Sequence, residues 1–345
     1  MNRRWICSDV WMDILPSFER VELGLKIALL SDRFDILVDK HFDRKSELTI
    51  WKTIKISKDE GPEPKVSVWT DGKCVDFPLP DRPLPIKIRF EDLWIEYIDY
   101  FVIEFVRSNK HIWDRMGTDL KFYIGDDQPI WDILAREMLP IFATSIRHLS
   151  LIAKDLDNLR RSTSPTILTD CNQLNSIFSC DLFPDAIGDD GPNATFSAGQ
   201  ALSKWLHTPS KNGQPKRWFC EDSDEEGNID WVNSFKEGCA FARATNSSVR
   251  YIIDFAVSKP SIEPFELVNE RTKEKLTLEK VPRYDNYLLL KRYPISEKAA
   301  AIQWENDENW EINLNSIRFN SYIGYNESIG PLSPPAEEEK EKADE

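Results

Sequence analysis

The sequence has few of the features that mark secreted, membrane or redox proteins. It contains only 6 cysteines in 345 residues, and they form no closely spaced pairs. No run reaches the roughly 18 consecutive apolar residues needed to cross a bilayer, and no secretory hydrophobic segment stands at the N-terminus. We therefore expect free thiols in a reducing compartment, which predicts a cytoplasmic or nuclear location.

Motifs for catalysis and for cofactors are also missing. The sequence has no Gly-x-Ser-x-Gly, no glycine-rich phosphate loop, no His-Glu-x-x-His and no Cys-x-x-Cys. The four histidines are far apart in the sequence and stand beside apolar residues: His41, His111, His148 and His207. We expect no catalytic residue, no metal and no cofactor, and hence a protein that is not an enzyme.

Positive charge is scarce as well. The chain has 44 lysines and arginines against 59 acidic residues, a formal net charge of −15. Nucleic acids and anionic membranes attract proteins through a positive surface, so neither is an expected partner.

One acidic stretch, residues 222–233, has oxygen-bearing side chains at the spacing of an EF-hand calcium loop, with Gly227 at its sixth position. Its twelfth position is Asn233, which lacks the bidentate carboxylate of such loops, and no helix is predicted before it. We favour a solvated acidic loop and predict no metal site.

Apolar residues are concentrated in the first 42 positions. The spacing predicts three short helices, the first capped by Asp9 and the third by Ser31. The middle segment, residues 20–30, is apolar on all sides, and such a helix needs to be covered on two sides. Either the rest of the chain or another protein is expected to cover it.

This N-terminal pattern resembles the F-box, the helical module that docks a substrate receptor onto the Skp-type adaptor of a cullin ubiquitin ligase. Ile14 and Phe18 fill the central positions, and residues 28–34 (ALLSDRF) match the end of the family pattern. Cys7 stands where the family has proline. The whole chain is similar to nematode F-box proteins with a variable C-terminal region.

The resemblance implies that the chain is the substrate receptor of an SCF-type ligase. It would bind a Skp-type adaptor through the N-terminal helices and an unknown protein target through the C-terminal region. The candidates for the adaptor-binding face and its support are Val10, Ile14, Leu15, Phe18, Leu25, Ala28, Leu29 and Phe34.

After this module (residues 1–45) the pattern changes to alternating β-rich runs. Residues 48–51, 54–56 and 66–69 are typical of strands, and Asp71 with Gly72 predicts a tight turn. We expect a small antiparallel meander and linker over residues 46–85.

Residues 86–257 alternate between short strands and helices. Strand anchors at Leu93, Leu120, Leu149 and Leu174 are separated by 27, 29 and 25 residues, close to the period of a leucine-rich repeat. Only part of the consensus is present, so we predict a degenerate repeat of the leucine-rich type, an α/β solenoid. A doubly wound α/β domain is the alternative fold, but it favours a glycine-rich first turn, and only 13 glycines are present.

Residues between the strand leucines are expected to point to the open face of such a stack. Aromatic and polar side chains on a rigid face suit protein binding. The candidates for target binding are Trp94, Glu96, Lys121, Tyr123, Ser150 and Ile152. The alternative is that Trp94 and Tyr123 pack beneath the meander and contact no partner.

Residues 258–328 read as hairpins that cap the stack, and residues 329–345 as a disordered acidic tail. The predicted fold class is thus α/β: a three-helix module, a meander, a repeat stack and a β-rich cap. The alternative function is a repeat scaffold unconnected with ubiquitin, in which the first helices only cap the stack.

Overall fold

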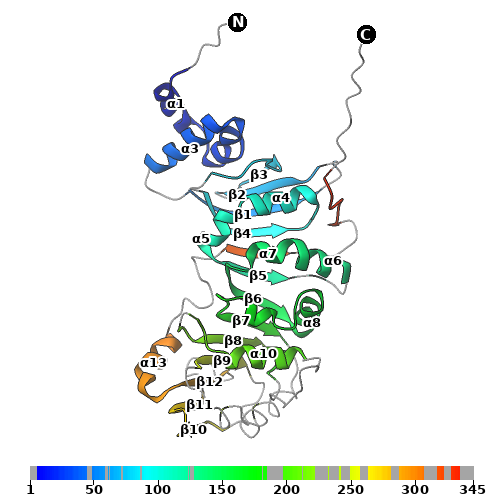
Figure 1. Cartoon of the computed structure of the whole chain (residues 1–345). Helices are drawn as coiled ribbons and strands as arrows, with labels where there is room; N and C mark the ends of the chain where they lie inside the picture. Colours follow the sequence, from blue (N-terminus) through cyan, green and yellow to red (C-terminus); the bar gives the residue numbers. More distant parts are fainter. Residues whose placement is uncertain are drawn as a thin grey trace. The chain divides into compact units, whose positions relative to one another are not determined.

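The computed structural model divides the chain into two compact units (Figure 1). The first comprises Met1–Ile112 and Ser321–Glu345, and the second Trp113–Asn320. The structure describes residues 6–44, 49–58, 61, 63–70, 73–85, 88–122, 124, 128–180, 182–184, 197–211, 213–221, 232, 241, 249–256, 263–280, 287–306, 317–321 and 328–334.

The first unit begins with a helical segment, residues 6–44. It consists of α1 (Ser8–Ile14), a 3-10 turn (Leu15–Ser17), α2 (Arg20–Glu22), a π-helical segment (Leu23–Ile27), a second 3-10 turn (Ala28–Leu30) and α3 (Asp32–Arg44). The prediction for Ser31 is confirmed, because its hydroxyl accepts the amide of Phe34 at 3.4 Å. The prediction for Asp9 is wrong: Cys7 precedes α1 and Asp9 lies in its first turn.

The helical segment has a core of its own. Trp11 packs edge-on against Phe34 with ring centroids 4.8 Å apart, which joins α1 to α3. Eight apolar side chains lie at 4% exposure or less: Leu15, Val21, Leu23, Leu25, Ala28, Leu37, Val38 and Phe42. Their burial from water drives the packing of these short helices.

The sheet of the first unit contains β1 (Thr49–Ser57), β2 (Lys65–Thr70), β3 (Lys73–Pro78) and β4 (Ile88–Ile95). Strands β1, β2 and β3 pair antiparallel, as predicted for the meander. β4 pairs in parallel with β1, with Trp94 beside Lys55. The strand expected to open the repeat stack therefore belongs to the sheet of the meander, because alternation of apolar residues does not identify a partner strand.

Two helices follow this sheet, α4 (Tyr100–Ser108) and α5 (Lys110–Met116). Asp99 caps α4, its carboxylate accepting the amide of Val102 at 2.9 Å. The division between the units falls after Ile112, within α5 and within the range 86–257 that the sequence assigned to the repeats.

The C-terminal region corrects another expectation. Gly330 and Pro331, predicted to lie at the start of a disordered tail over residues 329–345, are hydrogen-bonded to the backbone of Ile98 and Tyr100. The predicted tail therefore starts later than residue 329. Residues 335–345 lie outside the described part of the chain.

The second unit contains five parallel strands that neighbour one another in the order of the sequence. They are β5 (Thr118–Phe122), β6 (Ile146–Ile152), β7 (Ser176–Cys180), β8 (Lys216–Glu221) and β9 (Tyr251–Ala256). This single direction of strand addition differs from a doubly wound sheet, whose strand order reverses at a switch point.

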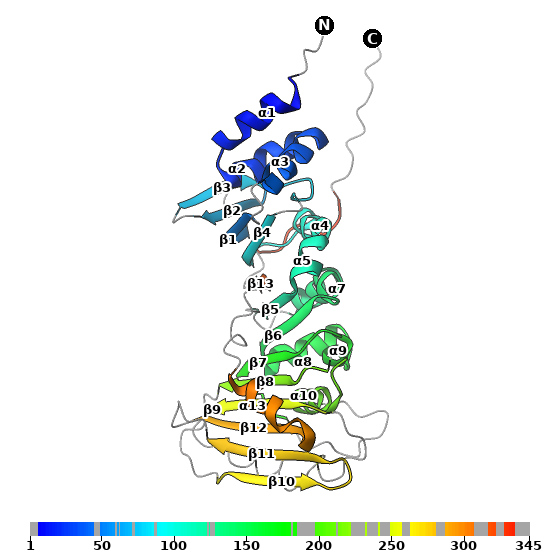
Figure 2. The ribbon, with the colours of Figure 1, turned by 90° about the vertical axis from the view of Figure 1, so that its left-hand side faces the viewer.

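Helices connect the parallel strands and lie on one side of them (Figure 2). They are α6 (Gln128–Ile133), continued by a π-helical segment (Leu134–Met138) and α7 (Leu139–Phe142), then α8 (Ala153–Ser162), α9 (Ile167–Asp170) and α10 (Ala198–His207). Leu120 and Phe122 of β5 line a small apolar void with Leu134 and Met138, so these strand residues face the helices.

The register of the strands differs from the predicted anchors. Leu149 pairs with Leu120 on one side and with Ile177 on the other. The predicted anchor Leu174 precedes β7, where its amide is bonded to the carbonyl of Cys171 and its side chain is buried. A buried leucine in a turn has the same sequence signature as one in a strand, which explains the error.

The second unit is extended by β10 (Phe265–Asn269), β11 (Glu274–Lys280) and β12 (Tyr287–Pro294), which pair antiparallel and join β9 through β12. A 3-10 turn (Ile295–Glu297), α13 (Lys298–Asn306) and β13 (Ile317–Ser321) complete it. The predicted β-rich character of this region is confirmed. No helix in the described ranges has the length and apolar character to cross a membrane.

Candidate functional site

The eight predicted adaptor-binding residues separate into support and surface. Three are core residues, with Leu15 at 0%, Ala28 at 1% and Leu25 at 4% exposure, and they can only support a docking face. Ile14, Phe18, Leu29 and Phe34 are half-buried. Val10 is exposed, and Ile14 lies one turn further along the same side of α1.

Three exposed apolar residues of the helical segment were missed from the sequence. Leu30 is 65% exposed, Ile36 55% and Ile6 46%. Leu30 belongs to the ALLSDRF run, where its exposure follows from the 3-10 turn that ends at this residue. With Val10 these residues form what we call the exposed helical set: Ile6, Val10, Leu30 and Ile36. Four exposed aliphatic side chains thus come from this one segment of the first unit.

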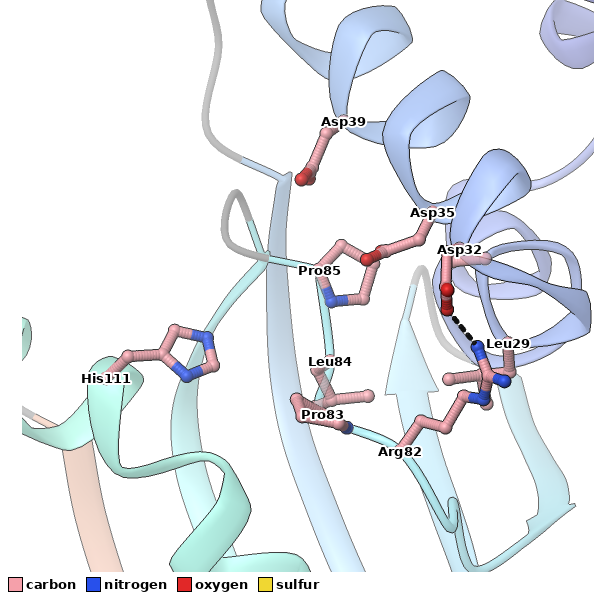
Figure 3. Close-up of a pocket in the computed structure, with 10 residues that line it drawn as sticks. Leu29, Asp32, Asp35, Asp39, Arg82, Pro83, Leu84, Pro85 and His111 are labelled. Carbon is pink, nitrogen blue, oxygen red and sulfur yellow. Dashed lines mark hydrogen bonds and ion pairs between the residues drawn. The ribbon is translucent and has the colours of Figure 1, made fainter.

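A cleft of about 490 Å³ lies beside the helical segment within the first unit (Figure 3). Three carboxylates of α3 line one side of it, and Arg82 pairs with the first of them, Asp32, at 2.7 Å. The remaining lining comes from Ala28, Leu29, Pro83, Leu84, Pro85 and His111, with Asp35 and Asp39 completing the acidic side. The cleft can accept a positively charged group above an apolar floor.

The carboxylate of Asp35 lies in surroundings that disfavour its negative charge. Burial raises the pKa of its carboxyl group, the nearby Asp32 raises it further, and Arg82 opposes both effects. One oxygen of Asp35 is buried without a hydrogen-bond partner in the described part of the chain. A further negative charge in this cleft would therefore be unfavourable.

The strand residues predicted to bind a target lie in both units. Lys121 of β5 pairs with Ser150 of β6, and Ile152 follows on the same side of β6 at 42% exposure. These three share the side of the sheet opposite the buried Leu149 and Leu151. We call this side of β5–β8 the open strand face.

The other predicted target-binding residues are not on this face of the second unit. Trp94 and Glu96 are in the first unit, where both are half-buried, and Glu96 forms an ion pair with Lys55 at 2.6 Å. Trp94 of β4 pairs with Lys55 of β1, so it belongs to the sheet that contains the meander strands. Tyr123 lies outside the described residues.

The open strand face holds an aromatic stack that was missed from the sequence. The rings of Phe178 and Phe219 stack with centroids 5.1 Å apart and an interplanar angle of 14°. Phe219 also stacks on Tyr287 of β12 at 6.2 Å. Phe178 pairs with Ser150 in register, so the stack continues the row of predicted residues. The register error at Leu174 hid it.

The open strand face also carries a histidine beside a carboxylate. His148 is 3.8 Å from a carboxylate oxygen of Asp119. Burial lowers the pKa of His148, and the neighbouring Asp119 only partly offsets this effect. A neutral imidazole on a strand face suits packing or hydrogen bonding to a partner better than charge attraction.

Metal-ligating side chains do not gather in the described ranges. Within them, no group of three or more histidine, cysteine, aspartate or glutamate side chains is arranged to hold a metal ion. The acidic stretch 222–233 lies outside the described residues except for Val232, which is buried.

Comparison with known proteins adds no family. No family model, no curated protein and no solved structure matches the chain. The functional argument therefore rests on the residues of this chain alone.

Proposed function

We propose that the chain is the substrate-recognition subunit of an SCF-type ubiquitin ligase. In this proposal the helical segment is an F-box-like module that binds a Skp-type adaptor, and the open strand face binds a protein target. The chain would catalyse no reaction itself and would raise the concentration of its target near the ubiquitin-loaded enzyme.

The observation that carries the proposal is the exposed helical set. Large aliphatic side chains with 46–65% exposure are costly to leave in water, and four of them come from one short segment. Core residues from all parts of the segment hold these helices together, so the exposed side chains do not result from an unpacked helix. The binding of a partner that covers these side chains would be stabilised by their removal from water.

The strand arrangement supports the second half of the proposal. Five parallel strands added in sequence order, with helices on one side, agree with a degenerate leucine-rich repeat. The aromatic stack on the other side offers large, rigid side chains, which protein interfaces favour.

The alternative, a scaffold in which the helices only cap the sheet, is favoured by two contacts within the first unit. Arg82 pairs with Asp32, and the ammonium of Lys26 lies 5.3 Å from the centroid of the Phe77 ring. The ion pair of Arg82 with Asp32 is exposed, and exposed pairs contribute little to stability, whereas the Phe77 ring is buried.

Co-purification with a purified Skp-type adaptor separates the two functions. The proposal predicts that residues 1–345 form a complex and that residues 43–345 remain folded without forming one. If neither chain binds and loss of the first 42 residues unfolds the remainder, the helices are a structural cap and the receptor function is wrong.

A further inference from the structure

Residues 328–331, which we call the strap, pack against the first unit through backbone hydrogen bonds and one isolated β-bridge. The amide of Ile98 donates to the carbonyl of Ser328 at 2.8 Å, and the amide of Gly330 donates to the carbonyl of Ile98 at 2.8 Å. The amide of Tyr100 donates to the carbonyl of Pro331 at 2.9 Å. Ile98 and Ile329 form a parallel bridge, the pattern with which a receptor binds an extended peptide.

The residues that receive the strap are also held by contacts with other parts of the first unit. Residues 97–100, which we call the strap groove, follow β4, and the amide of Glu96 just before them is bonded to the carbonyl of Ile56. Asp99 caps α4, and Lys58 donates to the hydroxyl of Tyr97 at 3.3 Å. The groove is thus fixed by β1, β4 and α4.

The groove also selects a residue type. A Cβ added to Gly330 would collide with the hydroxyl and ring of Tyr97 and with Asp99. Tyr97 is 4% exposed and Asp99 5%, so neither side chain has free space into which to move. Only glycine fits at this position, between a half-buried isoleucine and a proline.

We propose that the strap groove is an exchangeable peptide site, occupied in this chain by its own strap and open to a partner segment of the same Ile-Gly-Pro chemistry. The chain leaves the first unit after Ile112 and re-enters it at Ser321, so the strap and the strap groove both belong to the first unit. This proposal holds whether or not the helical segment binds an adaptor.

The test uses the full chain with Gly330→Val, which expels the strap, and a fluorescein-labelled peptide Ser-Ile-Gly-Pro-Leu-Ser, the sequence of residues 328–333. Fluorescence anisotropy measures binding. The matched control is Gly61→Val, because an added Cβ at Gly61 meets nothing within 4 Å. A second peptide carries valine in place of glycine.

We expect saturable binding of the first peptide to Gly330→Val. The wild type and Gly61→Val should bind at least about tenfold more weakly, because the tethered strap competes at a high effective concentration. The valine peptide should bind none of the three. Hydrogen exchange at the amides of Ile98 and Tyr100 should be fast in Gly330→Val and slow again when the peptide is added.

Three results would overturn the proposal: a folded Gly330→Val chain that binds no peptide, equal binding to the wild type, or binding of the valine peptide. If Gly330→Val does not fold, Ile329→Asp replaces it in the same assay. That change loosens the half-buried Ile329 side chain of the strap and adds nothing to the groove.

Discussion

The two units of this protein differ in where they place charged and apolar side chains. Among the described residues, every buried lysine, arginine and glutamate lies in the second unit. The most exposed large aliphatic side chains, Leu30 and Ile36, lie in the first. The second unit therefore buries its long charged side chains, whereas the first exposes its two most exposed aliphatic side chains to solvent.

The centre of this difference is a buried ion pair in the second unit. Glu274 is 0% and Arg292 1% exposed, and the guanidinium bonds one carboxylate oxygen through two nitrogens. The hydroxyl of Thr272 donates to the same oxygen at 2.9 Å, and the amide of Val249 donates to the other at 3.2 Å. These partners replace the hydrogen bonds that the buried carboxylate and guanidinium groups would make with water.

The largest effect is expected from Arg292→Leu, which leaves Glu274 buried without its counter-ion. The free energy of unfolding of the second unit should fall by about 3–5 kcal/mol, and that of the first unit should not change. Hydrogen exchange resolved by residue measures both. The double change Glu274→Leu with Arg292→Leu should recover much of the loss, and a loss shared equally by both units would break the comparison.

A smaller effect is expected from pH, again in the second unit. Burial lowers the pKa of His207 to about 4, from an ordinary value of 6.5. The unfolded chain therefore binds more protons between these values, so stability should be constant above pH 6.5 and fall as pH drops toward 4. We expect a loss of about 3 kcal/mol between pH 6.5 and pH 4. In His207→Gln this part of the pH dependence should disappear, and an unchanged pH profile would refute the assignment.

The smallest effect on stability is expected in the exposed helical set. Ile36→Lys should change the free energy of unfolding of the first unit by less than about 0.5 kcal/mol, because the side chain is 55% exposed and is not part of the core. Urea unfolding followed by tryptophan fluorescence measures it. A loss of several kcal/mol would show that Ile36 is structural and would remove it from the docking surface.

Local features of the fold could be predicted from the sequence, and long-range ones could not. Ser31 was identified as a helix cap because the cap and the helix it begins are adjacent in the chain. The meander could be predicted from the alternation of apolar and polar residues. The pairing of β4 with β1 could not, because a strand with this alternation fits equally well beside the meander or beside the repeat strands.

The strap shows the limit most clearly. Its sequence around Gly330 and Pro331 is typical of disorder. Its hydrogen bonds to Ile98 and Tyr100 are made by backbone atoms, so they leave no pattern in the sequence. The aromatic stack needed the strand register, and one misplaced anchor, Leu174, was enough to hide Phe178 and Phe219. On the helical segment, periodicity identified the apolar residues but could not separate the core residue Ala28 from the exposed Leu30.

The most direct test of the receptor function is the affinity of the full chain for a purified Skp-type adaptor, measured by titration calorimetry. The account predicts saturable binding that falls at least about 100-fold, or ~2.8 kcal/mol, when Leu30→Asp and Ile36→Asp are combined. Val268→Asp, at an exposed aliphatic residue of the second unit, should leave it unchanged. No binding by the wild type, or equal binding by all three chains, would contradict the account.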